Sequence, residues 1–120
     1  KGVLRGMHYQ SSPYQEVKYV SCISGSIFDV AIDMREDSSS YLSWYGCELN
    51  ADNFKSLYIP EGFAHGYQTL ESNSCIFYMV SNFYSKESER GVRYDDPSVN
   101  IDWPLQISTM SDKDKDIELI

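Results

Sequence analysis

The order of hydrophobic and polar positions along the chain predicts a protein built from short β-strands. Runs rich in β-branched and aromatic residues alternate with polar or glycine-containing breaks, and no long run has the periodicity of a helix. Because this pattern is typical of sandwiches and barrels, we expect an all-β fold. The strands are expected at residues 3–9, 15–23, 26–34, 42–49, 56–59, 66–70 and 74–82.

The breaks between these runs predict how the chain turns. The Ser24-Gly25-Ser26 break is short enough for a hairpin, so the strands on either side are expected to be antiparallel neighbours. From Ser85 onward charged residues and proline dominate, which indicates ordered loop and a short helix capped by Ser111. No internal repeat or linker divides the sequence, and we expect a single domain over residues 1–120.

Composition narrows the possible partners and the location. A chain of 120 residues with 42% hydrophobic residues can bury one core, and its ten Tyr suit strand faces and pocket walls. The formal charge of −8 argues against a nucleic-acid partner, because no basic stripe could displace counterions. No apolar run is long enough to span a membrane and no signal-peptide pattern opens the chain, so a cytoplasmic location is expected.

The three cysteines do not indicate a metal or redox site. Cys22, Cys47 and Cys75 cannot all pair with one another, and none has the spacing of a zinc motif. We expect reduced, mostly buried thiols.

The two histidines are the main candidates for chemistry. Strict alternation places His8 and Arg5 on opposite faces of the first strand, but an irregularity at Gly6 would bring both to one cavity. His65 closes a Pro-x-Gly-x-x-His pattern that resembles the second motif of the cupin superfamily, in which the histidine of metal-binding members is a ligand. The earlier half of that ligand set is missing here, so we expect no bound metal.

Six ordered blocks give a more specific resemblance. The chain is similar to the dTDP-4-dehydrorhamnose 3,5-epimerase family in GVLRGMHYQ, KYVSCISGSIFDVAIDMR, IPEGFAHGYQTL, FYMVSNFYSKESERGVRYDDP, IDWP and SDKD. This resemblance implies a cupin-type double-stranded β-helix, or jelly-roll barrel, with a short C-terminal loop and helix tail. Family members carry a further segment before the first block, which exchanges strands between subunits and touches the nucleotide, and we expect this chain to lack it.

The resemblance also implies catalytic roles for an epimerase of nucleotide-linked 4-keto-6-deoxy sugars. His8 matches the general base and Asp114 the carboxylate that orients it. Tyr78 matches the acid on the far side of the sugar ring, while Lys18 and Arg5 match cations around the carbonyl and the diphosphate. A neutral imidazole suits proton abstraction near neutral pH, and a preplaced ammonium can stabilise an enolate.

Further substrate contacts are expected by the same resemblance. Tyr84 would line the pocket, His65 and Asp29 would form a second imidazole–carboxylate pair that positions the substrate, and Gln10 lies on the His8 face of its strand. No cofactor is expected, the substrate is a nucleotide-diphosphate sugar, and the protein is expected to be a homodimer.

Three alternatives remain open at this point. The same barrel serves 3-epimerases, 5-epimerases, ketoisomerases and epimerases of GDP-linked sugars, and the sequence does not fix which carbons are inverted. A non-catalytic sugar-binding module is a second possibility. A metal-dependent dioxygenase is the third, and the small number of candidate ligands argues against it.

Overall fold

The computed structural model describes residues 1–120 and contains eight strands and one short helix. The strands are β1 (Leu4–Gln10), β2 (Lys18–Ser24), β3 (Ser26–Asp33), β4 (Trp44–Asn50), β5 (Ser56–Ile59), β6 (Phe63–Thr69), β7 (Cys75–Val80) and β8 (Glu89–Gly91), and the helix is α1 (Asp112–Lys115). The expectation of an all-β fold is therefore confirmed.

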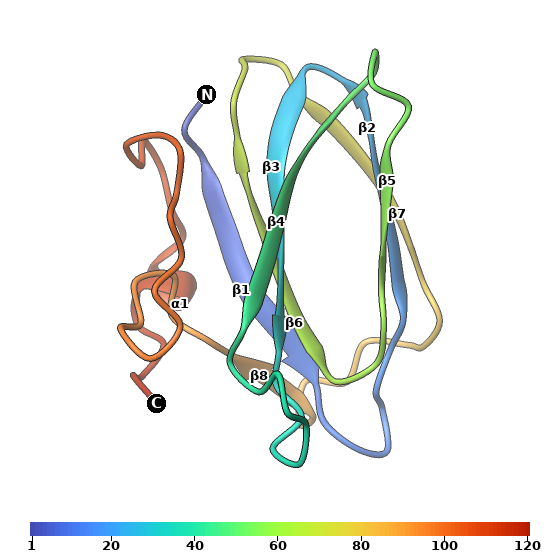
Figure 1. Cartoon of the computed structure of the whole chain (residues 1–120), viewed down its shortest axis with the longest axis vertical. Helices are drawn as coiled ribbons and strands as arrows, with labels where there is room; N and C mark the ends of the chain where they lie inside the picture. The colour runs from blue at the N-terminus through green and yellow to red at the C-terminus, as the bar shows by residue number, and fades with distance from the viewer.

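Two antiparallel sheets face each other (Figure 1). The larger sheet has the order β4-β3-β6-β1-β8 and the smaller one the order β5-β2-β7. Every strand pair in both sheets is antiparallel. The larger sheet therefore has an inner face, which is directed toward the smaller sheet, and an outer face on the opposite side.

Each face of the larger sheet carries its own hydrophobic core, and β3 contributes to both. Ile27 and Ala31 pack with side chains of β2, β4 and β5 between the two sheets. Val30 and Ile32 point the other way, where they pack with Met7. Because both faces of β3 are buried, apolar residues lie on both sides of the strand, and each fully buried aliphatic side chain contributes about 1.5–3 kcal/mol.

The C-terminal tail covers the outer face of the larger sheet (Figure 1). Val92 and Val99 belong to the outer core, and Trp103 packs edge-on against Phe28 with ring centroids 6.2 Å apart. The Trp103 indole N–H donates to the Tyr94 carbonyl oxygen at 2.9 Å. The tail is therefore a packed layer of the fold, and it carries α1 to the edge of β1.

Two sequence predictions about the tail and the turns are resolved by the structure. Ser111 caps α1, as predicted, and its hydroxyl accepts from the Asp114 amide. The hairpin predicted at Ser24-Gly25-Ser26 is wrong, because β2 and β3 belong to different sheets. Gly25, with φ +72°, lets the chain cross from one sheet to the other where it passes Ser74, and a Cβ at Gly25 would lie 2.4 Å from the Ser74 hydroxyl.

Smaller differences concern strand limits and the cysteines. Residues 15–17 precede β2 without joining it, β6 begins three residues before its predicted start, and the three-residue strand β8 was not predicted. All three cysteines are free, but only Cys22 is buried and Cys75 is exposed. The expectation of mostly buried thiols is wrong for Cys75 because β7 is the outer strand of its sheet.

Candidate active site

An irregularity in β1 brings two of the predicted residues into one cavity. Arg5 pairs with Tyr67 of β6 and His8 with His65, and the register shifts between them. Gly6 sits at the shift with φ +120°, and a Cβ there would lie 2.7 Å from the Gly66 Cα. Only glycine fits this close approach of β1 to β6. The register shift places Arg5 and His8 along the same cavity, as predicted.

His8 and Asp114 form a close pair although they come from opposite ends of the chain. The His8 Nε2 atom lies 2.7 Å from the Asp114 Oδ1 atom. The other carboxylate oxygen of Asp114 accepts the Gly6 backbone N–H at 3.1 Å, and the Asp114 side chain is only 5% exposed. Because the carboxylate engages Nε2–H, the lone pair of neutral His8 is on Nδ1.

The Nδ1 side of the ring faces a second carboxylate. Glu89 Oε1 lies 3.6 Å from His8 Nδ1, and the same oxygen accepts from Lys113 Nζ at 2.7 Å. Glu89 Oε2 accepts from the Tyr84 hydroxyl at 2.7 Å. Burial alone would raise the pKa of Glu89, but the hydrogen bonds from Lys113 and Tyr84 outweigh it and hold the pKa below its ordinary value.

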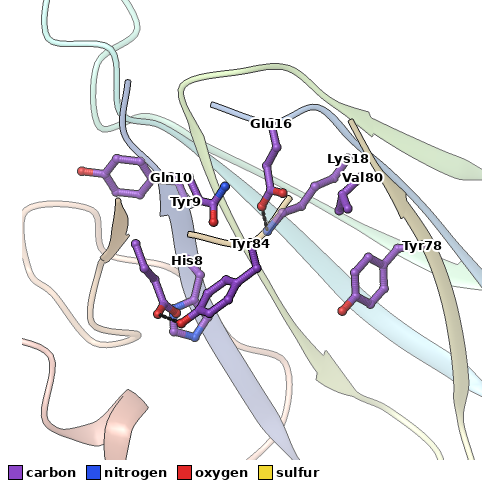
Figure 2. Close-up of a pocket in the computed structure, with 9 residues that line it drawn as sticks. His8, Tyr9, Gln10, Glu16, Lys18, Tyr78, Val80 and Tyr84 are labelled. Carbon is purple, nitrogen blue, oxygen red and sulfur yellow. Dashed lines mark hydrogen bonds and ion pairs between the residues drawn. The ribbon is translucent and has the colours of Figure 1, made fainter. Parts of the chain in front are cut away.

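Two adjoining cavities share His8, Lys18 and Tyr78 in their walls. The larger has a volume of about 270 Å³ and the smaller about 140 Å³. Figure 2 shows His8 on β1 and Tyr78 on β7 at opposite sides of the larger cavity, with the Tyr78 hydroxyl directed into the space between them. An imidazole and a phenol thus face each other from the two sheets.

Lys18 is a largely shielded cation at the wall between His8 and Tyr78 (Figure 2). Its Nζ atom lies 3.6 Å from Glu16 Oε1, and both side chains are largely shielded from solvent. Burial lowers the pKa of Lys18, and the Glu16 carboxylate opposes that shift without cancelling it. A weakly hydrated ammonium of this kind can stabilise a negative charge that develops on a ligand oxygen.

His65 and Asp29 form a second imidazole–carboxylate pair, deeper in the interior. His65 Nε2 lies 2.7 Å from Asp29 Oδ1, and Asp29 is fully buried. The pair comes from neighbouring strands β6 and β3, and His65 lines the smaller cavity beside Arg5. The structure thus brings together the two residues that the sequence analysis paired.

A sequence model of the family described as dTDP-4-dehydrorhamnose 3,5-epimerase matches residues 1–120. The chain belongs to this family. A Shigella flexneri dTDP-4-dehydrorhamnose 3,5-epimerase is 50% identical over 114 residues, which cover 95% of the chain and 63% of that enzyme. The chain therefore spans somewhat less than two thirds of the length of this relative.

Solved structures of family members have the same fold. The Bacillus anthracis epimerase with TDP and PPi bound is 38% identical with a TM-score of 0.95, and the match covers 99% of the chain and 68% of that structure. The Legionella pneumophila dTDP-6-deoxy-D-glucose-3,5-epimerase in complex with dTDP-4-keto-L-rhamnose is 42% identical with a TM-score of 0.93, covering 99% and 63%. The predicted cupin-type jelly roll is confirmed.

The two remaining predicted residues, Gln10 and Tyr84, line the larger cavity. The Gln10 amide nitrogen donates to the carbonyl oxygens of Tyr14 and Phe83, and its oxygen accepts from the Ser85 amide. Gln10 therefore ties together the two loops that border the larger cavity. Tyr84 lines that cavity but is 66% exposed, and its hydrogen bond to Glu89 raises the pKa of its phenol.

Sequence reasoning missed several polar residues that line the two cavities, among them Glu16, Tyr67 and Glu89. Glu89 lies in a charged segment predicted as ordered loop, and Glu16 lies in residues predicted as strand. Tyr67 follows His65 at the two-residue spacing of one strand face, which could have placed it in the interior. Burial raises the pKa of Tyr67, whereas Arg5 opposes that shift.

Two further observations bear on metals and membranes. Groups of three His, Cys, Asp or Glu side chains arranged to hold a metal ion are not found, and the expectation of a metal-free site stays a prediction. The single helix, α1, lacks the length and hydrophobicity of a membrane span.

Proposed function

We propose that this chain inverts C3, C5 or both in a nucleotide-linked 4-keto-6-deoxy sugar, as an epimerase that uses no cofactor. The observation that carries the proposal is the His8–Asp114 pair facing Tyr78 across a cavity beside Lys18. A base and an acid on opposite walls are what inversion requires, because the proton leaves one face of the sugar and returns to the other.

The first half of the proposed reaction removes a proton from the carbon next to the ketone. His8 Nδ1 takes the proton, and the C–H electron pair moves into the C–C bond and onto the carbonyl oxygen. Asp114 holds the ring by its other nitrogen and stabilises the imidazolium that forms. Lys18 stabilises the enolate oxygen, an interaction that can lower the barrier by several kcal/mol in a water-poor cavity.

The second half returns a proton to the opposite face. The Tyr78 hydroxyl protonates the carbon, the enolate electrons return, and the carbonyl re-forms. The Tyr78 phenolate then regains a proton and His8 loses one, so no proton is gained or lost overall. Arg5, with the His65–Asp29 pair, is placed to hold the sugar or the diphosphate in the smaller cavity.

The substrate and the assembly are proposed from the relatives. The B. anthracis structure contains TDP and the L. pneumophila structure contains dTDP-4-keto-L-rhamnose, so we propose a dTDP-linked sugar. We also propose that residues 1–120 act as one domain, that the protein works as a homodimer, and that it acts in the cytoplasm.

Solvent-deuterium uptake tests the proposal. Incubation of dTDP-4-keto-6-deoxyglucose with the protein in deuterium oxide is expected to place deuterium at C3 or C5 and to invert that carbon, as measured by NMR. His8→Ala should abolish both label uptake and inversion. Tyr78→Phe should still take up label, because His8 can return a deuteron to the face it deprotonated, but should not invert the carbon.

The outcomes separate the proposal from its rivals. Label uptake by His8→Ala at the wild-type rate would exclude His8 as the base. Binding of the nucleotide sugar by the wild-type protein without any label uptake would identify a sugar-binding module in place of an enzyme.

A further inference from the structure

Glu89 lies at the nitrogen of His8 that must be free to accept a proton. The distance of 3.6 Å from Glu89 Oε1 to His8 Nδ1 is too long for a hydrogen bond but short enough for a strong charge interaction. Glu89 and His8 come from neighbouring strands, since β8 pairs with β1 in fixed register. The separation is therefore set by the sheet and by what else binds the Glu89 oxygens.

Two donors hold the Glu89 carboxylate away from the imidazole. Lys113 binds Oε1 at 2.7 Å, and Oε1 is the oxygen that faces His8. Tyr84 binds Oε2 at 2.7 Å. With both oxygens engaged, the carboxylate stays charged next to the ring but too far away to accept a hydrogen bond from Nδ1.

We propose that Glu89 is a positioning residue that acts through His8, and that Lys113 sets its distance. The carboxylate leaves Nδ1 open before proton abstraction and stabilises the positive ring afterwards. Asp114 does the same from the other nitrogen, so the imidazolium forms between two carboxylates. The role in catalysis rests on the proposed epimerase activity, but the coupling between Glu89, Lys113 and His8 does not.

Other charged and titratable groups line the cavities around His8, and the test must leave them in place. Besides Glu89, Lys113, Tyr84 and Asp114, they are Arg5 and Tyr9 on β1, Glu16 before β2, Lys18 on β2, His65 and Tyr67 on β6, Tyr78 on β7, Lys86 in the loop before β8 and Arg90 on β8. Substitutions at Glu89 and Lys113 keep all of them.

The coupling is tested in the ligand-free protein by NMR titration of the His8 ring protons. The chain has only two histidines, so His8→Gln assigns the signals. Glu89→Gln should lower the pH midpoint of the His8 titration by about half to one pH unit, because the imidazolium loses a neighbouring negative charge. Lys113→Met should raise the midpoint, because Oε1 is released and can approach Nδ1.

The double variant decides whether Lys113 acts through Glu89. With Glu89→Gln already present, adding Lys113→Met should move the midpoint much less than in the wild-type background. Midpoints unchanged in both single variants, or an equally large effect of Lys113→Met without the carboxylate, would overturn the inference.

The catalytic part is tested by label uptake. Glu89→Gln is expected to lower kcat for deuterium uptake by roughly tenfold with little change in KM, since the effect falls on the charged transition state. Unchanged kcat would overturn the catalytic role. If the wild-type protein takes up no label, the proposed function fails, whereas the titration still tests the coupling.

Discussion

Replacing Asp114 by Asn tests the pair at the centre of the site with the least change of shape. Asp114 is 5% exposed and accepts from His8 Nε2 at 2.7 Å and from the Gly6 amide at 3.1 Å. The amide of Asn can keep the Gly6 contact, but it removes the negative charge. If the Asn NH2 group faces His8, Nε2 must accept a hydrogen bond and the ring proton moves to Nδ1. The Nδ1 atom must be unprotonated to act as the base.

The expected magnitudes follow from these contacts. Hydrogen bonds to a charged group contribute about 1.5–3 kcal/mol and neutral ones about 0.5–1.5 kcal/mol, so the free energy of unfolding should fall by roughly 1–2 kcal/mol. Activity should fall much more, by roughly 10²- to 10⁴-fold, for two reasons. The substitution favours the wrong tautomer of His8, and it removes the charge that stabilises the His8 imidazolium. Urea denaturation measures the first quantity and the rate of deuterium uptake the second.

Asp112→Asn on the same helix is the matched control. Asp112 is exposed and its side chain makes no contact with His8, so this variant should keep wild-type activity and stability within error. The reasoning would be refuted by an Asp114→Asn protein whose label uptake stays within about threefold of the wild-type rate.

Two more predictions concern the buried ammonium and the close approach of β1 to β6. Burial lowers the pKa of Lys18, so its stabilising charge should be lost at a lower pH than for an exposed lysine, and activity should decline on the alkaline side. In Lys18→Arg, where the guanidinium stays charged, the residual activity measured as a pH–rate profile should lack that decline. Gly66→Ala should lower the free energy of unfolding by about 1–3 kcal/mol in urea, because its Cβ would lie 2.5 Å from the Arg5 carbonyl oxygen. Gly91→Ala is the control, since its Cβ would meet mainly the end of the flexible Ile117 side chain at 2.8 Å, and an equal loss in both variants would contradict the backbone argument.

The parts of the fold that the sequence predicts are those governed by local periodicity. Strand β5 matches its predicted limits, and alternation on β3 separates the inner residue Ile27 from the outer residue Val30. The hairpin at Gly25 was mispredicted because the residues that allow a tight turn also allow a crossing between sheets. Only the pairing of β2 with β7 and β5, which is not local, decides between the two.

In the candidate site, too, some residues could be identified from the sequence, whereas others depend on non-local strand pairing. The resemblance gave His8, Asp114, Lys18 and Tyr78, and the structure gathers all four around adjoining cavities or next to them. Glu89 could not be predicted from its position among charged residues, because its importance depends on a strand pairing formed with β1. Physical proximity across the sheet, and not the local pattern, makes it part of the site.

The location of Asp114 on α1 makes the site depend on docking of the C-terminal tail. A molecule in which both sheets have formed but the tail has not docked would contain His8, Lys18 and Tyr78 yet lack the Asp114 carboxylate that binds His8 Nε2. As in Asp114→Asn, proton abstraction by His8 is expected to be much slower in such a partly folded state. Any local opening of the tail would therefore take the orienting carboxylate away from His8 while both sheets stay paired.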